Sequence, residues 1–465
     1  MCWRAGVSCV PAGLNWPWSW KPKAMGGSST CRRRPEMSLA QELDTRLRET
    51  LPRWSGHDLA WLQDYRQQTL AAFRETDPGS KPDKQWQLGT TLPRSLSAVR
   101  PGIDPAWLQH YRLPEAFCLV FVDGVLRPEY SVRDDLPDGV VLKALSEMRA
   151  EELTAHRARL TPPATDPLTR WNLIWLQDGV CLDIPERVCL QRPVQILCLA
   201  SNVGELIPLR HLLTLGSQAE ASVMETYAGL EGATGFTLTS TDIRLGTAAL
   251  LDHHSLQRES TRARHCHSIQ VESGPRARFR QHHVALGAAR SLTTISNPLG
   301  LAAESQLNGL FHLAGSQQGE IHTRIDHAAP RGNSRQSYRG LATDQAKGVF
   351  DGIIQVQPQA GKISATMQNR NLLLSPAAEI DSRPQLEISA DDVQCSHGVT
   401  VGQLDADAVF FLTARGLSEV EARTILGFAF ANEIIQSVPP GHYRSLVQTA
   451  FLASLPQADI HQDWL

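Results

Sequence analysis

Gly216-Ser-Gln-Ala219 is the first of four related stretches that decide the fold of this chain. Gly246-Thr-Ala-Ala249, Gly274-Pro-Arg-Ala277 and Gly300-Leu-Ala-Ala303 follow it at intervals of 30, 28 and 26 residues, and segments of alternating polarity come after the turns. A small residue at a turn, a short strand and a recurrence of this length are the requirements of a β-solenoid, whose coils stack on one another. An ordinary multi-strand sandwich with accidental glycine spacing is the alternative.

The sequence around these repeats divides the chain into units. Residues 38–47, 58–73 and 141–160 have helical patterns, and Phe117–Val122 followed by Asp123-Gly124 predicts a buried strand and a tight turn. Ser418-Glu-Val-Glu421 is a capping box that begins a further helix. We therefore predict a mainly β protein: a mostly helical N-terminal domain at 37–165, a parallel β-helix (solenoid) core at 166–412 and a C-terminal helical domain at 413–465.

Residues 1–36 differ in composition from the rest of the chain. They contain six basic residues and one acid, so the remaining residues carry 39 basic against 47 acidic side chains, a net charge of −8 instead of −3. The segment has no continuous apolar region and does not resemble a transit helix. We expect a non-native or disordered extension, with translation starting at Met37; a targeting sequence is the alternative.

Composition excludes several classes of protein. The chain is 42% hydrophobic and 20% charged, which is typical of a globular protein, and no run approaches the roughly 20 apolar residues of a membrane helix. An acidic body argues against nucleic-acid binding. Nine cysteines without paired spacing favour a reducing cytoplasmic location, and the lack of a Cys-x-x-Cys pair argues against an autonomous zinc site.

The sequence contains none of the common catalytic motifs. It has no GxxxxGK[ST], no GxGxxG after a strand, no HExxH and no GxSxG, so we expect no enzyme of those classes. Histidine is the unusual accumulation, with ten of sixteen between His253 and His397. His265 and His267 would share one strand face and could offer two imidazoles to a metal, although a place on a solvated solenoid face or in a hydrogen bond is more common for such residues.

The densest local signal is Leu386-Glu-Ile-Ser-Ala-Asp-Asp-Val-Gln-Cys-Ser-His-Gly398. Cys395 and His397 would project from the same face of a strand, a thiol beside an imidazole. Both side chains ligate iron and zinc. Two protein ligands are too few for a closed site, so the others would come from another chain or a bound cluster.

This region resembles the SufB/SufD family of iron–sulfur cluster assembly scaffolds. The resemblance rests on Met367–Ser375, Pro384–Ile388 and Asp392-Val-Gln-Cys-Ser-His-Gly-Val-Thr-Val-Gly402, and the Cys-Ser-His-Gly form with Phe410–Gly416 is closer to the SufD branch than to SufB. It is specific over 320–436 and looser over 170–320. The family implies a right-handed parallel β-helix between helical terminal domains, in agreement with the repeat spacing.

The resemblance also implies a function. A SufD-like chain is a non-catalytic scaffold subunit that pairs with a SufB-like paralogue as a heterodimer, or with itself in isolation, and docks a SufC-like ATPase. It implies no tightly bound cofactor but transient iron or an iron–sulfur cluster shared with SufB, with His397 and Cys395 at that interface. ATPase docking would use the C-terminal helices, where we select Ile425, Leu426 and Phe428.

A β-helix enzyme acting on polysaccharide is the rival hypothesis. Such an enzyme would need a cluster of carboxylates on one strand face, aromatic platforms and a secretion signal. Here the acids are dispersed and the solenoid region has few Trp or Tyr residues. We therefore favour the scaffold.

Overall fold

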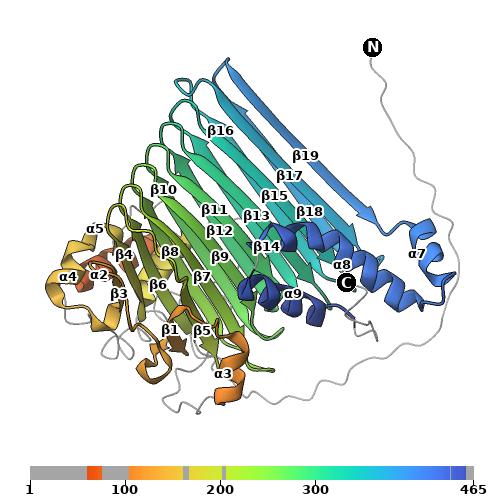
Figure 1. Cartoon of the computed structure of the whole chain (residues 1–465), viewed down its shortest axis with the longest axis horizontal. Coiled ribbons are helices and arrows are strands. Elements are labelled where there is room, and N and C mark those ends of the chain that lie inside the picture. The colour runs from red at the N-terminus through yellow and green to blue at the C-terminus, as the bar shows by residue number, and fades with distance from the viewer. Residues whose placement is uncertain (1–59, 76–103, 161–166, 202–205, 440, 457–465) are drawn as a thin grey trace, which may run out of the picture.

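A computed structural model describes residues 60–75, 104–160, 167–201, 206–439 and 441–456. These residues form two long sheets that enclose a common core, with helices at both ends of the chain (Figure 1). From β4 (Asp178–Ile184) onwards, successive strands alternate between the two sheets. From β6 (Leu206–Leu215) onwards, each strand pairs in parallel with the strand two positions earlier, which is the topology of a parallel β-solenoid of about eight turns. The predicted fold class is confirmed.

The first sheet contains ten strands in the described part of the chain. In spatial order they are β19 (Val393–Gln403), β17 (Ile363–Leu373), β15 (Asn333–Ala342), β13 (Glu304–Leu313), β11 (Arg278–Ala285), β9 (Leu250–Arg258), β7 (Glu220–Gly229), β5 (Val194–Ala200), β1 (Phe117–Val122) and β2 (Val125–Leu126). All neighbours are parallel except β1 and β2.

The second sheet contains nine strands within the same described ranges. They are β18 (Glu379–Ile388), β16 (Lys347–Val356), β14 (Gln318–His327), β12 (Arg290–Leu299), β10 (Arg264–Ser273), β8 (Phe236–Leu245), β6 (Leu206–Leu215), β4 (Asp178–Ile184) and β3 (Val141–Ala144). Only β3 and β4 pair in the antiparallel sense.

The helices cover parts of both sheets. Those on the N-terminal side are α2 (Ala60–Glu75), α3 (Pro105–Tyr111), η3 (Pro128–Tyr130), η4 (Leu145–Glu147), α4 (Ala150–Ala155), α5 (Arg157–Leu160) and α6 (Pro167–Trp175). Those on the C-terminal side are α7 (Ala406–Thr413), α8 (Glu419–Ser437) and α9 (His442–Ser454), of which α8 and α9 pack on the ten-stranded sheet (Figure 1).

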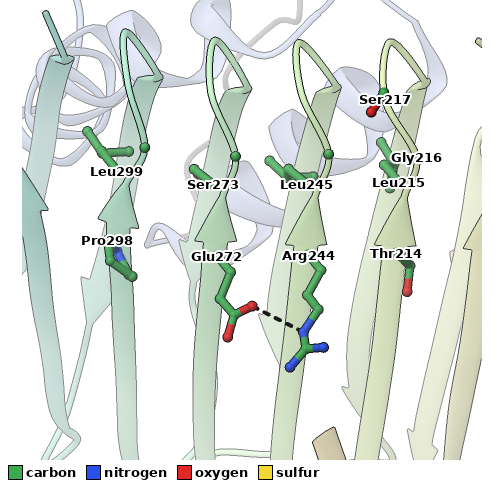
Figure 2. A pocket seen from close by; sticks show the side chains of 13 residues that line it. Thr214, Leu215, Gly216, Ser217, Arg244, Leu245, Glu272, Ser273, Pro298 and Leu299 are labelled. Atoms are coloured by element: carbon green, nitrogen blue, oxygen red, sulfur yellow. Dashed lines mark ion pairs between the residues drawn. The ribbon is translucent and has the colours of Figure 1, made fainter. Parts of the chain in front are cut away.

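The Gly-x-x-Ala stretches are the turns that lead from a strand of the nine-stranded sheet to the next strand, in the ten-stranded sheet, and they stack on one another from coil to coil. The Gly246 amide donates to the carbonyl of Leu215 in the preceding coil at 2.8 Å, and a Cβ atom on Gly246 would lie only 2.7 Å from the Ser217 nitrogen. The closing Ala249 is fully buried. Figure 2 shows the ends of the neighbouring strands β6, β8, β10 and β12 side by side at these turns. Glycine is therefore required where the turns of neighbouring coils touch, and alanine where the turn enters the core.

The N-terminal region, for which we predicted a mostly helical domain at 37–165, contains short strands as well as helices among its described residues. The strand Phe117–Val122 and its turn are present, with Asp123 and Gly124 at φ 49° and 76°, the geometry that favours Asp-Gly in hairpins. However, β1 and β3 are hydrogen-bonded into the two sheets, so this region completes the first coil. Residues 141–160, for which we predicted a helix, begin with the strand β3 because alternate residues of Val141–Ala144 are buried, a period of two.

Two of the sequence-based expectations concern residues that the structure does not describe. The extension at 1–36 and the helical pattern at 38–47 lie outside the described residues, whereas the pattern at 58–73 corresponds to α2.

The Ser418 capping box is confirmed: the Ser418 hydroxyl accepts from the Glu421 amide at 3.2 Å, and the Glu421 carboxylate accepts from the Ser418 amide at 2.6 Å. Within the described ranges, none of the helices is long and apolar enough to cross a bilayer.

Substituting a turn glycine will test the stacking of the coils. Gly246→Ala places a methyl group against backbone atoms of the preceding coil, which cannot move aside as a flexible side chain could. We expect a loss of about 1–3 kcal/mol in the free energy of unfolding, as for other overpacked sites. Gly361→Ala is the matched control, because a Cβ atom there meets no atom within 4 Å. Equal thermal midpoints for the two variants would contradict this account.

Candidate functional site at the open end of the solenoid

The last strand of the ten-stranded sheet, β19, has an open edge. It pairs with β17 on one side, and none of the described strands pairs with its other side. Natural sheets usually protect such edges with charged residues or proline. The neighbouring terminal strand β18 contains Pro384 and four charged residues, but Val393–Gln403 contains neither a charged residue nor a proline. The backbone of β19 is therefore exposed and unprotected.

Cys395 and His397 lie on this open strand. Their register partners on β17 are Ala365 and Met367, both fully buried in the core, so both side chains project from the inward face of the coil. Cys395 is half-buried and packs against the core, and burial raises the pKa of its thiol. His397 is exposed. The structure thus places the two predicted residues side by side at the mouth of the solenoid, where the next coil would stack.

Exposed apolar side chains lie further along β19 and on the helix that follows it. Val399 and Val401 continue the same face of β19 and are 45% and 46% exposed. Phe410 and Phe411, on α7 directly after β19, are 72% and 54% exposed. Exposed apolar groups gathered beside an unpaired strand edge are typical of a protein–protein interface.

The three predicted docking residues do not share one environment. Ile425 and Leu426 are half-buried on α8. Phe428 is only 3% exposed and packs with Ala431, Ile434 and residues of the ten-stranded sheet, so a partner cannot contact its side chain in this conformation. Its selection as a docking residue is wrong, because α8 has apolar residues on more than one side and the side of Phe428 faces the solenoid.

The histidines of the middle coils line a polar interior. Glu225, fully buried on β7, accepts from the Tyr227 hydroxyl at 2.5 Å and from the Thr241 hydroxyl at 2.8 Å. Its carboxylate lies 3.0 Å from His253 Nε2 and 3.2 Å from His267 Nε2. The pKa of Glu225 is held well below its usual value by these imidazoles, although burial acts in the opposite direction. Sequence reasoning missed Glu225, and its inward position on an alternating strand is the signal that could have found it.

His265 and His267 do share a strand face but bind different carboxylates. His265 Nδ1 lies 2.7 Å from Glu259, whereas His267 Nε2 lies 3.2 Å from Glu225. Among the described residues, neither belongs to a group of three potential metal-ligand atoms. The interpretation as hydrogen-bonding core residues fits the geometry better than the interpretation as a metal pair.

Comparison with known proteins defines the class of this chain. The family model described as "SUF system FeS cluster assembly, SufBD core domain" matches residues 198–430, and that of the "SufBD protein N-terminal region" matches residues 113–196. The chain therefore belongs to the SufBD family of iron–sulfur cluster assembly proteins. The resemblance recognised from Asp392–Gly402 is confirmed.

Individual relatives agree with this assignment. An iron–sulfur cluster assembly SufBD family protein of Synechocystis sp. is 30% identical over 381 residues, covering 77% of this chain and 83% of the relative. The iron–sulfur cluster assembly protein SufD of Escherichia coli is 30% identical over 338 residues, covering 69% and 75%. The chloroplastic protein ABCI7 of Arabidopsis thaliana is 27% identical over 334 residues, covering 69% and 70%. These likenesses place the chain in iron–sulfur cluster assembly.

The buried histidines predict a steep loss of stability in acid. Burial lowers the pKa of His211, His282, His312 and His327 to about 4 and that of His283 to about 3. Below about pH 6.5 the unfolded chain binds protons that the folded chain does not, so stability falls as the pH decreases from 6.5 towards 4. Each such histidine contributes about 1.4 kcal/mol per pH unit over this window.

Thermal midpoints between pH 7.5 and 4.5 will measure this dependence. His312→Gln should reduce the slope of stability against pH, because that position no longer takes up a proton on unfolding. His442→Gln, at an exposed position, should leave the slope unchanged. A slope that is the same in the wild type and His312→Gln would contradict the assignment of neutral buried imidazoles.

Proposed function

We propose that this chain is a non-catalytic, SufD-like scaffold subunit of an iron–sulfur cluster assembly complex, acting in a reducing cytosolic compartment. Membership of the SufBD family supports the role in cluster assembly. The observation that carries the finer proposal is the unprotected edge of β19 with Cys395 and His397 on its inward face. The six cysteines of the described residues are free thiols, in keeping with reducing conditions.

Pairing with a SufB-like paralogue would use the open end of the solenoid. A partner strand that pairs with β19 would satisfy its free backbone groups and cover Val399 and Val401. Phe410 and Phe411 on α7 would extend the apolar contact beyond the strand. A second copy of this chain has the same edge, which is a reason to expect a homodimer when the paralogue is absent.

Iron or a cluster is the cargo that Cys395 and His397 would hold at this contact. Thiolate and imidazole are both good ligands for iron, and two ligands from one chain bind it weakly enough to allow release. A partner thiolate or carboxylate would complete the coordination. Because burial raises the pKa of Cys395, its thiol is protonated before metal arrives, whereas the exposed His397 is accessible to an incoming ion.

A SufC-like ATPase would dock on the C-terminal helices. Val420 at the start of α8 is 51% exposed, and Ile425 and Leu426 on the same helix are half-buried. Together with the exposed Phe410 and Phe411 of α7, they offer an apolar surface beside the helix pair α8 and α9, which packs firmly on the solenoid. ATP hydrolysis would then take place on the partner, since this chain has no P-loop sequence.

Removing the His397 imidazole will test the cargo role. We expect His397→Ala to leave assembly with the SufB-like and SufC-like chains intact on a sizing column. Cluster maturation in cells should fall about tenfold or more, since even the loss of an outer-shell partner costs that much in metal affinity. Cys395→Ala should have a smaller effect if that thiol mainly packs against the core. Normal cluster delivery by an intact His397→Ala complex would overturn the cargo role.

A charge on α8 will test ATPase docking. Ile425→Asp should abolish co-purification of the ATPase, because burying an unpaired charge in an interface costs several kcal/mol. Val420→Asp, at a more exposed position, should weaken docking less. Phe428→Asp is the contrasting variant, which should unfold the C-terminal helices because Phe428 lies in the core. Full retention of the ATPase by a folded Ile425→Asp protein would place the docking surface elsewhere.

A further inference from the structure

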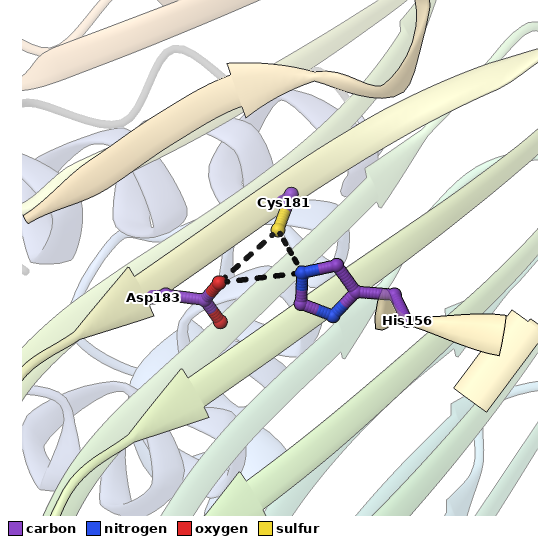
Figure 3. Close-up of side chains that lie close together, drawn as sticks. All are labelled: His156, Cys181 and Asp183. Carbon is purple, nitrogen blue, oxygen red and sulfur yellow. Dashed lines mark hydrogen bonds and ion pairs between the residues drawn. The ribbon is translucent and has the colours of Figure 1, made fainter. Parts of the chain in front are cut away.

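Three potential ligand side chains meet on the outer face of β4, at the end of the solenoid opposite β19 (Figure 3). Cys181 and Asp183 are two residues apart on this strand and therefore share a face. His156 follows α4 directly and is fixed there by a 3.1 Å hydrogen bond from its amide to the carbonyl of Leu153. Two elements that are distant in sequence thus direct a thiol, a carboxylate and an imidazole to one point.

The distances among the three groups are nearly equal. His156 Nε2 lies 3.6 Å from Cys181 Sγ and 3.5 Å from Asp183 Oδ2, and Cys181 Sγ lies 3.5 Å from the same Oδ2. Zinc bonds to nitrogen, oxygen and sulfur are about 2.0–2.3 Å long, so tetrahedral geometry places ligand atoms about 3.3–3.8 Å apart. A single ion fits at equal distances from all three atoms without movement of the backbone.

We propose that His156, Cys181 and Asp183 bind one divalent transition-metal ion, with zinc as the best match to this donor set. Zinc is a borderline-soft ion that binds thiolate, imidazole and carboxylate ligands, and it prefers tetrahedral coordination, with which the spacing of these three atoms agrees. Three protein ligands leave a fourth position open to water or another ligand. This site is separate from the open edge of β19 and does not depend on the function proposed for it.

Charges of both signs surround the site. Burial lowers the pKa of His156, and the positive charges of Arg159 and Arg244 lower it further and oppose a bound cation. The negative charge of Glu152 acts in the other direction and favours a cation. Arg159 lies nearby, but its Nε is paired with Asp242 at 2.9 Å. Arg244 is paired with Glu272 at 3.1 Å, a contact between adjacent coils that is visible in Figure 2. The other carboxylate oxygen of the site, Asp183 Oδ1, is buried and has no hydrogen-bond partner within the described residues.

The protonation states of Cys181 and His156 before metal binding determine how many protons must leave when an ion binds. Burial and the Asp183 carboxylate raise the pKa of Cys181 to about 12, so the thiol is protonated and donates to Asp183 Oδ2. Burial lowers the pKa of His156, which leaves a neutral imidazole with a lone pair for a metal. The incoming ion forms a bond to sulfur and the thiol proton leaves to solvent, so one proton is released for each ion bound.

The site is both rigid and accessible. On β4, Cys181 pairs with Lys143 of β3 on one side and with Leu212 of β6 on the other, so the strand is held from both sides. Cys181 is fully buried, whereas the His156 and Asp183 side chains are 19% and 33% exposed. An ion can therefore enter from the side of His156 and Asp183 and reach the thiol, which forms the inner wall of the site.

Cobalt(II) is the probe that will test this proposal, because its absorption reports on thiolate bonding and on tetrahedral geometry. The full-length chain, stripped of metal with a chelator, should bind one equivalent of cobalt with a thiolate charge-transfer band and strong visible bands. Zinc should displace the cobalt and raise the thermal midpoint. Cys181→Ser should lose the charge-transfer band, and Asp183→Asn and His156→Gln should each weaken cobalt binding at least tenfold.

Two other cysteines provide matched controls. Cys189→Ser removes an exposed thiol that lies 3.8 Å from Glu220, and Cys395→Ser removes the thiol at the open edge. Both variants should keep the spectrum of the wild type. The proposal is overturned if the wild type shows no thiolate band, if the band persists in Cys181→Ser, or if either control loses it. Should Cys181→Ser fail to fold, loss of the zinc-dependent thermal shift in folded His156→Gln is the deciding result, and retention of that shift refutes the site.

Discussion

Backbone contact between the turns of neighbouring coils is the constraint on which the rest of this structure depends. The Gly246 and Gly274 amides each donate to the carbonyl that ends the corresponding strand of the coil before, at 2.8 and 2.9 Å. The turns cannot slide past one another, so inward positions stack on inward positions along the whole solenoid. The same stacking gives every strand two neighbours except at the ends, which is why one edge of β19 pairs with none of the described strands.

The fixed stacking also explains how the interior can hold charged and polar groups. Glu225 on β7 reaches His253 on β9 of its own sheet and His267 on β10 of the other, so one carboxylate links three strands and both sheets. An unpaired buried charge would cost several kcal/mol, and a shift of one coil by two residues would leave Glu225 without these partners. We infer that the polar interior specifies the register of the middle coils more than it adds to their stability.

Local sequence signals predicted the features that depend on local spacing. The Gly-x-x-Ala turns follow from close approach and burial at fixed positions, and the shared face of Cys395 and His397 follows from a spacing of two on a strand. Features that depend on contacts between distant segments were missed. The inward side of Phe428 is decided by the sheet beneath α8, and His156 meets Cys181 across 25 residues and two kinds of element. A sequence pattern cannot show which of several apolar or polar faces of a helix or strand packs against another segment of the chain.

The two ends of the solenoid differ in a way that limits how the chain can associate. At the N-terminal end the sheets finish with β2 and β3, strands of two and four residues that pair in the antiparallel sense, and short edge strands oppose further pairing. At the other end β19 offers eleven residues without charge or proline. Strands that added at both ends would build a filament, whereas one open end allows two chains to meet and then stop. A closed pair, with Cys395 and His397 at its centre, is the assembly that this asymmetry favours.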